Sequence, residues 1–114
     1  MKQIRAIKEA EVELTKHLLV LAKKDPDQFE LPEKVDEYEG GVMGSINFTL
    51  GSSGDYAGDV IQVEYIDTDG IRVLITLTQN SKGELLDLDF WKENFSKLLR
   101  YPQPDQVTIN THGI

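Results

Sequence analysis

The sequence predicts an α+β domain in which an N-terminal helix and a short C-terminal helix pack on one face of an antiparallel meander sheet of about four to five strands. Three observations predict this fold class. Apolar residues recur at helical spacing in residues 8–24, β-rich runs separated by glycine turns fill the middle of the chain, and a short amphipathic segment ends at two prolines. A length of 114 residues suits a single domain over residues 1–114.

The N-terminal helix is expected over residues 8–24. Its apolar stripe recurs every three or four positions and consists of Val12, Leu14, Thr15, Leu18, Leu19, Leu21 and Ala22. Glutamates crowd the first turns and Lys23 and Lys24 stand in the last, an order that suits the helix dipole. The helix should end at Asp25, because the residue before a proline avoids the helical region.

Residues 25–39 are expected to form an acidic connector. It holds seven carboxylates and a single base, Lys34. Its apolar residues are spaced so that they can pin the connector to the body, with residues 35–38 as a short strand. Glycine residues 40 and 41 then form a turn.

Four strands are expected to follow, over residues 45–50, 59–66, 71–79 and 84–90. The last three form an antiparallel meander, because Asp-Gly between two β-rich runs is a strong hairpin signal.

Residues 91–100 are expected to form the C-terminal helix, with Phe95, Leu98 and Leu99 facing inward. Pro102 and Pro104 end it. Residues 107–111 are either a last edge strand or a loose tail.

Composition excludes several kinds of function. A net charge of −8 disfavours binding to nucleic acid or to an anionic membrane and favours a basic protein partner. The chain has no cysteine, which excludes disulfides, zinc-thiolate sites and thiol catalysis. No run approaches the roughly 20 apolar residues of a membrane span, and the N-terminus lacks the pattern of a signal peptide. We therefore expect a cytoplasmic protein.

Asp87 and Asp89 are the strongest candidates for chemistry. Two residues apart on one strand, their carboxylates would lie about 7 Å apart on one face. Such a pair can serve acid–base catalysis or bind a divalent metal. The alternative is the polar face of an amphipathic strand, where Lys92, Arg72 or a backbone N–H would pair a carboxylate.

Three weaker motifs favour structural interpretations. Asp67, Thr68, Asp69 and Gly70 resemble the opening of a calcium loop, but the twelfth position is a threonine within a strand, so a hairpin turn is expected. The segment 51–54 lacks the Gly-Lys-Ser/Thr of a phosphate loop. The two histidines, His17 and His112, have no fixed relation. No metal, cofactor or catalytic residue is therefore assigned.

Trp91 is the only tryptophan and stands where the last strand meets the expected helix. We expect a packing anchor beneath that helix, with an exposed contact for a partner as the alternative.

A set of motifs resembles those of a small bacterial family with no assigned function, a domain of unknown function. The family has a Leu-acid-Leu-Asp-x-Trp-Lys signature, matched here by Leu85-Leu86-Asp87-Leu88-Asp89-Phe90-Trp91-Lys92. It also has a Gly-Gly-Met-Gly-Ser-type segment, an aspartate-glycine hairpin and a later proline, matched by residues 40–45, 67–70 and 102. The family's Ser/Thr helix cap is absent at Ile7 and Lys8. The resemblance implies no catalytic residues, and such small acidic domains are similar to immunity proteins, which implies a toxin partner.

The sequence thus favours a non-enzymatic bacterial binding protein, with an immunity-type inhibitor of a basic toxin as the specific form. The residues expected to contact a partner are Glu37, Glu39, Asp87, Asp89, Trp91 and Lys92. The alternative is a small enzyme or ligand-binding domain that uses Asp87 and Asp89 near the turn between Gly40 and Ser45. A homo-oligomer formed through an uncovered strand is a third interpretation.

Overall fold

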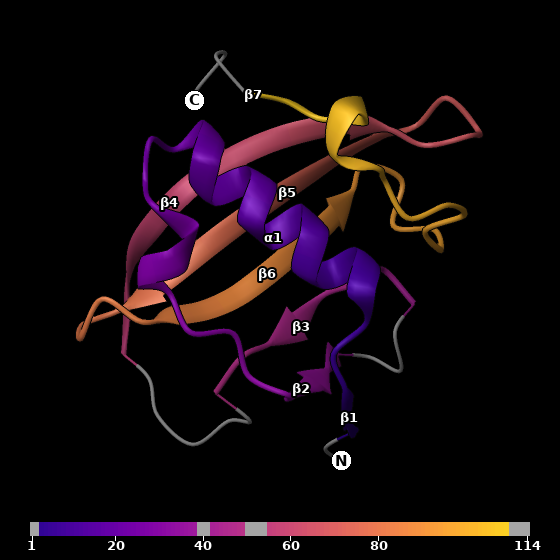
Figure 1. The fold of residues 1–114 in the computed structure, drawn as a ribbon. Coiled ribbons are helices and arrows are strands. Elements are labelled where there is room, and N and C mark those ends of the chain that lie inside the picture. The colour runs from indigo at the N-terminus through magenta and orange to yellow at the C-terminus, as the bar shows by residue number, and fades with distance from the viewer. Residues whose placement is uncertain (1–2, 39–41, 50–54, 110–114) are drawn as a thin grey trace.

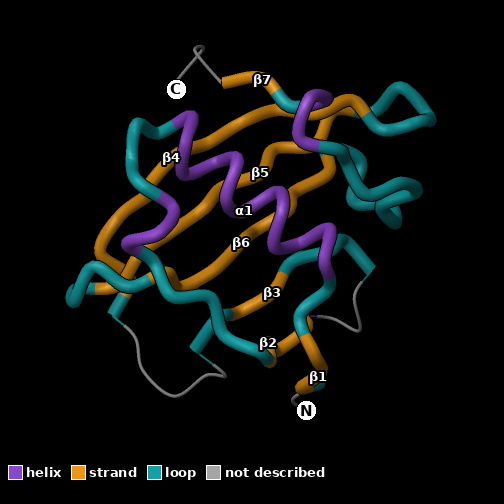
Figure 2. Tube along the Cα trace, in the orientation of Figure 1, coloured by secondary structure: helices purple, strands orange, loops and turns teal. Residues whose placement is uncertain are grey.

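The computed structural model describes residues 3–38, 42–49 and 55–109. Over these residues the strands form one seven-stranded antiparallel sheet in the order β1-β2-β3-β6-β5-β4-β7. A single α-helix of the described residues, α1 (Glu9–Leu21), crosses one face of this sheet (Figures 1 and 2). The expected sheet of four to five strands with two helices is therefore wrong. The fold is mostly sheet, with one helix and short 3₁₀ turns at Pro26–Gln28 and Pro104–Gln106.

The centre of the sheet is the predicted meander of β4 (Tyr56–Ile66), β5 (Arg72–Asn80) and β6 (Leu85–Lys92). The Asp-Gly hairpin joins β4 to β5 as expected. Gly70 has a φ of 81°, in the left-handed region that glycine adopts readily, and its N–H donates to the Asp67 carbonyl at 2.9 Å. Alternation of apolar and polar residues together with local turn chemistry was enough to predict this part of the sheet.

Short strands complete the sheet at both edges. They are β1 (Ile4–Ala6), β2 (Lys34–Glu37), β3 (Ile46–Asn47) and β7 (Thr108–Ile109). The short strand expected near residues 35–38 is confirmed as β2. Of the two alternatives for residues 107–111, the edge strand is present as β7, and residues 110 and 111 lie outside the described residues. The strand expected over residues 45–50 shrinks to two residues, and its last position lies outside the described residues. β1 was missed because three residues give no periodic signal, and its pairing with β2 is visible only in the fold.

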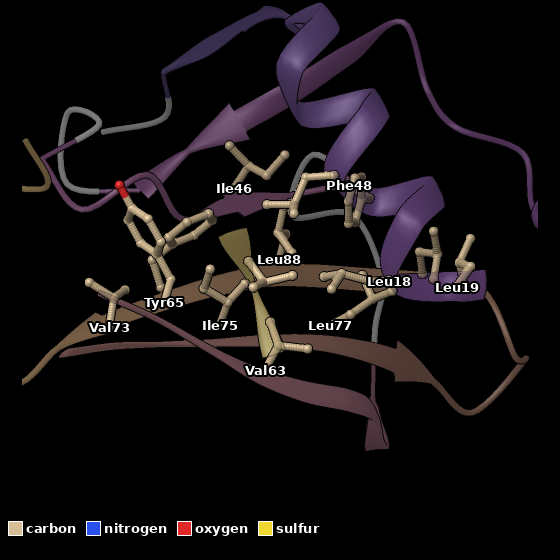
Figure 3. Close-up of a cluster of buried hydrophobic side chains, with 14 of the residues drawn as sticks. Leu18, Leu19, Ile46, Phe48, Val63, Tyr65, Val73, Ile75, Leu77 and Leu88 are labelled. Carbon is tan, nitrogen blue, oxygen red and sulfur yellow. The ribbon is translucent and has the colours of Figure 1, made fainter. Parts of the chain in front are cut away.

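α1 confirms the predicted N-terminal helix, but it ends at Leu21 and not at Asp25, and Lys23, which was expected in its last turn, has a φ of 62° that a right-handed helix cannot include. The helix supplies one side of the core. Leu14, Leu18 and Leu19 are fully buried, and they pack with apolar side chains from the sheet, as Figure 3 shows for Leu18 beside Leu77. Each fully buried leucine contributes about 1.5–3 kcal/mol relative to an exposed one. The face of the sheet that carries α1 is therefore the face that holds the core.

Residues 93–100 do not form the expected C-terminal helix. The chain continues as β6 through Lys92 and then turns, and Phe95 has a φ of 62°, which a right-handed helix cannot include. The N–H of Leu99 donates to the Asp67 carboxylate at 2.8 Å instead of to a carbonyl four residues earlier. Phe95 and Leu99 are 69% and 57% exposed rather than facing inward. A long-range contact has overridden the local helical spacing.

The alternation of β6 divides its side chains between the two faces of the sheet. Leu88, Phe90 and Lys92 are buried on the side of α1, while Asp89 and Trp91 point away from it. We call the side opposite α1 the open face, because no α-helix of the described residues covers it (Figure 1). The expected packing anchor at Trp91 is wrong, since the residue is 38% exposed and no helix of the described residues lies over it.

No helix in the described part of the chain is long and apolar enough to cross a membrane.

Candidate functional site

A hollow on the open face brings together segments that are far apart in the sequence. It lies where the residue after β2, the segment leading into β3, the strand β6 and the loop after β6 meet. Its volume is about 560 Å³, within the range of ligand pockets. We call it the aromatic–acidic pocket, and its lining residues are Tyr38, Met43, Ser45, Asp87, Asp89, Phe90, Trp91 and Phe95.

Asp87 is held in the pocket by two neutral donors. The Tyr38 hydroxyl donates to its Oδ1 at 2.7 Å, and Asn47 Nδ2 donates to the same oxygen at 2.9 Å. Asn47 is placed for this contact because it lies directly opposite Asp87 in the β3–β6 ladder. Burial and the hydrogen bond to Asp87 raise the pKa of Tyr38 to about 12. At neutral pH Tyr38 is therefore a hydrogen-bond donor and not a base.

Asp89 is connected to the segment before β3 through Ser45. The buried Ser45 hydroxyl accepts the Phe90 N–H at 2.8 Å. Its own proton can go either to Asp89 Oδ1 or to the Phe90 carbonyl, each at 3.3 Å. Both aspartates thus point into one pocket from adjacent positions on the open face of β6.

Two exposed aromatic rings form the wall of the pocket beside the carboxylates. Trp91 and Phe95 meet edge to face, with ring centroids 5.7 Å apart and an interplanar angle of 85°. Such an arrangement matches the preferred geometry of aromatic pairs. Two large apolar side chains that stay exposed side by side, next to carboxylates, are typical of a binding surface.

A buried charged cluster lies behind this wall, on the other side of β6. Lys92 Nζ donates to Asp67 Oδ2 and Asp69 Oδ2, both at 2.8 Å, and to the Lys97 carbonyl at 2.9 Å. The side chains of Lys92 and Asp67 are 1% and 0% exposed. We call Asp67, Asp69 and Lys92 the lysine hub. It explains the resemblance of the hairpin to a calcium loop, because both aspartates converge on a cation that belongs to the chain itself.

The hub stabilises the charged forms of its members. Burial alone would raise the pKa of Asp67, but the N–H of Leu99 and the ammonium of Lys92 bring it below its usual value. The pKa of Asp69 is lowered chiefly by its hydrogen bond to Lys92. Burial would lower the pKa of Lys92, and the bonds to the two aspartates raise it instead. All three groups are therefore charged at neutral pH.

The structure separates the six residues that the sequence singled out for partner binding. Asp87, Asp89 and Trp91 line the pocket, whereas Lys92 points to the opposite side of the sheet and belongs to the hub. Glu37 is 17% exposed and pairs with Arg5 at 2.6 Å. Glu39 lies outside the described residues, as do the first two residues of the glycine turn.

Several pocket residues were not identified from the sequence. Tyr38 was expected only to pin the connector, and Phe95 to face the core. Asn47 was expected only as part of the strand over residues 45–50. Tyr38 and Asn47 find their partner Asp87 at separations of 49 and 40 residues, and for Phe95 the local pattern pointed inward. The one signal in the sequence that could have identified a pocket residue was Tyr38, an aromatic side chain within the acidic connector.

Two further hollows border the connector. One, of about 720 Å³, lies between residues 28–33 and the β5–β6 turn, and the other, of about 690 Å³, lies between residues 26–33 and α1. The aromatic–acidic pocket is the better candidate, because hydroxyl and amide donors orient carboxylates there beside exposed rings. Among the described residues, no group of three or more His, Asp and Glu side chains is arranged to hold a metal ion.

Comparison with known families gives a match over most of the chain. A family model described as a domain of unknown function, DUF6984, matches residues 4–102, which include the whole pocket and the whole hub. Neither the curated proteins nor the solved structures gave a match. The predicted relation to a family of unknown function is confirmed at this level. The Leu-acid-Leu-Asp-x-Trp-Lys signature and the relation to immunity proteins stay predictions.

Proposed function

The chain belongs to the DUF6984 family, a domain of unknown function, and from that premise we propose that it is a non-enzymatic binding protein for a basic protein partner. One observation carries the proposal: the aromatic–acidic pocket places Asp87 and Asp89 beside the exposed pair of Trp91 and Phe95. A side chain that is both cationic and flat satisfies both kinds of group. Arginine has these properties, because its guanidinium stacks on aromatic faces and pairs with carboxylates.

The pocket is organised before a partner arrives. The hydrogen bonds from Tyr38 and Asn47 orient the Asp87 carboxylate, and both use Oδ1. Groups that are already ordered lose less conformational entropy on binding. The net charge of −8 adds a long-range attraction that speeds encounter with a basic surface.

The hydroxyl groups of the pocket favour binding over catalysis. Tyr38 has a pKa of about 12, so its hydroxyl is a poor base at neutral pH. The Ser45 hydroxyl accepts a backbone N–H at 2.8 Å, which suits a structural link between β6 and the segment before β3. Each hydroxyl has a carboxylate as an acceptor, Asp87 for Tyr38 and Asp89 for Ser45, but histidine, the side chain that most often acts as a general base, is not among their hydrogen-bond partners in the described residues.

The test is an NMR titration of the full chain with the peptide acetyl-Gly-Arg-Gly-Arg-Gly-amide and with its citrulline counterpart, which keeps the shape and removes the charge. We expect the arginine peptide to shift amide signals around Tyr38, Ser45 and residues 87–95, and the citrulline peptide to leave them in place. The double variant Asp87→Asn/Asp89→Asn should lose most of this binding.

A matched control removes the same charge elsewhere. The double variant Glu30→Gln/Glu33→Gln changes two exposed carboxylates of the acidic connector, and it should bind the arginine peptide nearly as well as the wild type at 0.15 M salt. If both double variants weaken binding equally, net charge alone is responsible and the pocket is not the site. If neither peptide shifts the pocket signals at millimolar concentration, the proposal is wrong.

The immunity-type version of the proposal makes the basic partner a toxin. Its support is the acidic charge and the small size of the domain. It is tested by whether a basic toxin encoded beside this protein loses activity when mixed with the wild type, and keeps its activity when mixed with the Asp87→Asn/Asp89→Asn variant. A toxin inhibited equally by both proteins would contradict recognition through the pocket.

The second candidate is a small-ligand site for an organic cation. It is favoured by the convergence of Asp87, Asp89 and Ser45 on a single pocket of about 560 Å³. Free arginine amide and a trimethylammonium compound such as choline distinguish the two candidates in the same titration. Saturable binding of either compound, tighter than that of the peptide, would favour the small-ligand site.

A further inference from the structure

The loop that carries Phe95 is held by the lysine hub and not by secondary structure of its own. Lys92 Nζ donates to the Lys97 carbonyl at 2.9 Å. The carboxylate of Asp67 accepts the N–H of Leu99 at 2.8 Å and the N–H of Arg100 at 3.1 Å. Three backbone groups of residues 97–100 are therefore tied to buried side chains of the hub.

Two further backbone hydrogen bonds of the same loop hold it next to the pocket. The N–H of Phe95 donates to the Lys92 carbonyl at 2.9 Å, which places Phe95 in a tight turn directly after β6. The N–H of Leu98 donates to the Val42 carbonyl at 3.0 Å, so the loop also reaches the segment before β3. Gly44 in that segment has a φ of 94°, and a Cβ there would lie 3.2 Å from Leu98 Cδ2. The loop thus bridges the hub and the pocket.

Phe95 has few other restraints. Its side chain is 69% exposed and its recorded ring contact is with Trp91. A backbone φ of 62° is unfavourable for phenylalanine, so surrounding contacts must maintain it. The ties at residues 97–100 supply those contacts.

We propose that the lysine hub is a positioning element of the aromatic–acidic pocket: Lys92, with Asp67 and Asp69, holds Phe95 against Trp91 without touching the partner. The contacts of residues 95–100 support the effect of the hub on the position of the Phe95 ring. The effect on affinity for a partner rests on the proposed function. The hub lies on the core side of the sheet and the pocket on the open face, so the effect passes through the loop.

The experiment compares two hub variants with a control on the same loop. Lys92→Met keeps the length of the side chain and removes the charge. Asp69→Asn is milder, because Asp69 is 32% exposed and Lys92 keeps its bond to Asp67. Glu93→Gln is the control: Glu93 is next to Lys92 and pairs with Arg72 at 3.3 Å, outside the hub.

Two readouts are taken from each folded variant. The first is the set of nuclear Overhauser contacts between the Trp91 and Phe95 rings, together with the Trp91 emission maximum. The second is the affinity for the arginine peptide acetyl-Gly-Arg-Gly-Arg-Gly-amide. We expect Lys92→Met to lose the ring contacts, to shift the emission and to bind roughly tenfold more weakly, as loss of an aromatic contact commonly does. Asp69→Asn should show a smaller change in the same direction, and Glu93→Gln should match the wild type.

The outcomes separate this inference from the proposed function. Ring contacts that persist in both hub variants overturn the inference, and if Lys92→Met does not fold, Asp69→Asn decides it. Ring contacts that are lost while the affinity stays unchanged overturn the part that concerns affinity. A wild type that binds no peptide overturns the proposed function, while the ring contacts still decide the role of the hub.

Discussion

Replacing Trp91 with alanine tests the assignment of this residue to the surface of the pocket. A tryptophan ring buries up to about 250 Å², and with 38% of the residue exposed roughly 150 Å² is buried here, equivalent to about 4 kcal/mol at 25 cal/mol/Å². An extended reference chain overstates this area by roughly 10–40%, and removal of a ring from the surface leaves no closed cavity. We therefore expect Trp91→Ala to lower the free energy of unfolding by about 2.5–3.5 kcal/mol.

Leu88→Ala provides the comparison on the same strand. Leu88 is 0% exposed and faces the core, so its truncation should cost about 2–5 kcal/mol. Urea unfolding followed by far-ultraviolet circular dichroism measures both variants, since the signal does not depend on the tryptophan. Titration calorimetry with the arginine peptide measures binding under conditions in which both variants are folded.

The two variants should differ in their affinity for the peptide more than in their stability. Trp91→Ala should lose at least tenfold in affinity besides its loss of stability, as expected for an aromatic hot spot. Leu88→Ala should lose a comparable amount of stability and keep its affinity. A Trp91→Ala variant that is as destabilised as Leu88→Ala and still binds the peptide normally would refute the assignment.

Three other predictions follow from single contacts. The pKa of Asp67 lies below its usual value, so its contribution to stability is present above the unfolded pKa of about 3.9 and is lost as pH falls through the lower folded pKa. The urea midpoint of the wild type should therefore fall more steeply at acid pH than that of Asp67→Asn, and identical pH dependences of the two midpoints would contradict this prediction. Gly44→Ala should cost about 1–3 kcal/mol because of the φ of 94° and the close approach of Leu98, visible as a lower thermal midpoint. The absorbance difference at 295 nm between the wild type and Tyr38→Phe should titrate near pH 12, and Asp87→Asn should move it toward the ordinary value of 10.0; a wild-type midpoint near 10 would be inconsistent with the hydrogen bond.

Local patterns were sufficient for the long elements, in which apolar and polar residues alternate over many positions. α1 and the meander of β4, β5 and β6 were predicted because their apolar residues repeat with the period of the element. The prediction of the Asp-Gly hairpin succeeded for the same local reason, because the turn chemistry is contained in four residues.

The candidate site was predicted in part. The alternation of β6 correctly grouped Asp87 and Asp89 on one face, whereas Trp91, which lines the same pocket, was expected to anchor a helix that does not form. The same pattern gave no sign that Lys92, one position later, would be buried with Asp67. A buried lysine is exceptional unless it is paired, and the pair is formed between residues 25 positions apart.

The loop after β6 shows why local spacing misled the prediction. Residues 91–100 carry apolar residues that would suit a short helix, yet the available partners for their backbone lie in the hub. Isolated helices of this length are marginal, so strong bonds to a buried carboxylate are enough to prevent one from forming.

By itself, the sequence determined the long elements of this protein and the acidic, cysteine-free character of the chain, because periodicity, turn chemistry and composition are properties of neighbouring residues. Only the tertiary structure decided the strand β1, the short length of β3, the extended loop after β6 and the pocket. These depend on contacts such as those of Tyr38 with Asp87 and of Ser45 with Asp89, at separations of 49 and 44 residues. Such contacts exist only once the sheet has brought β2, β3 and β6 together.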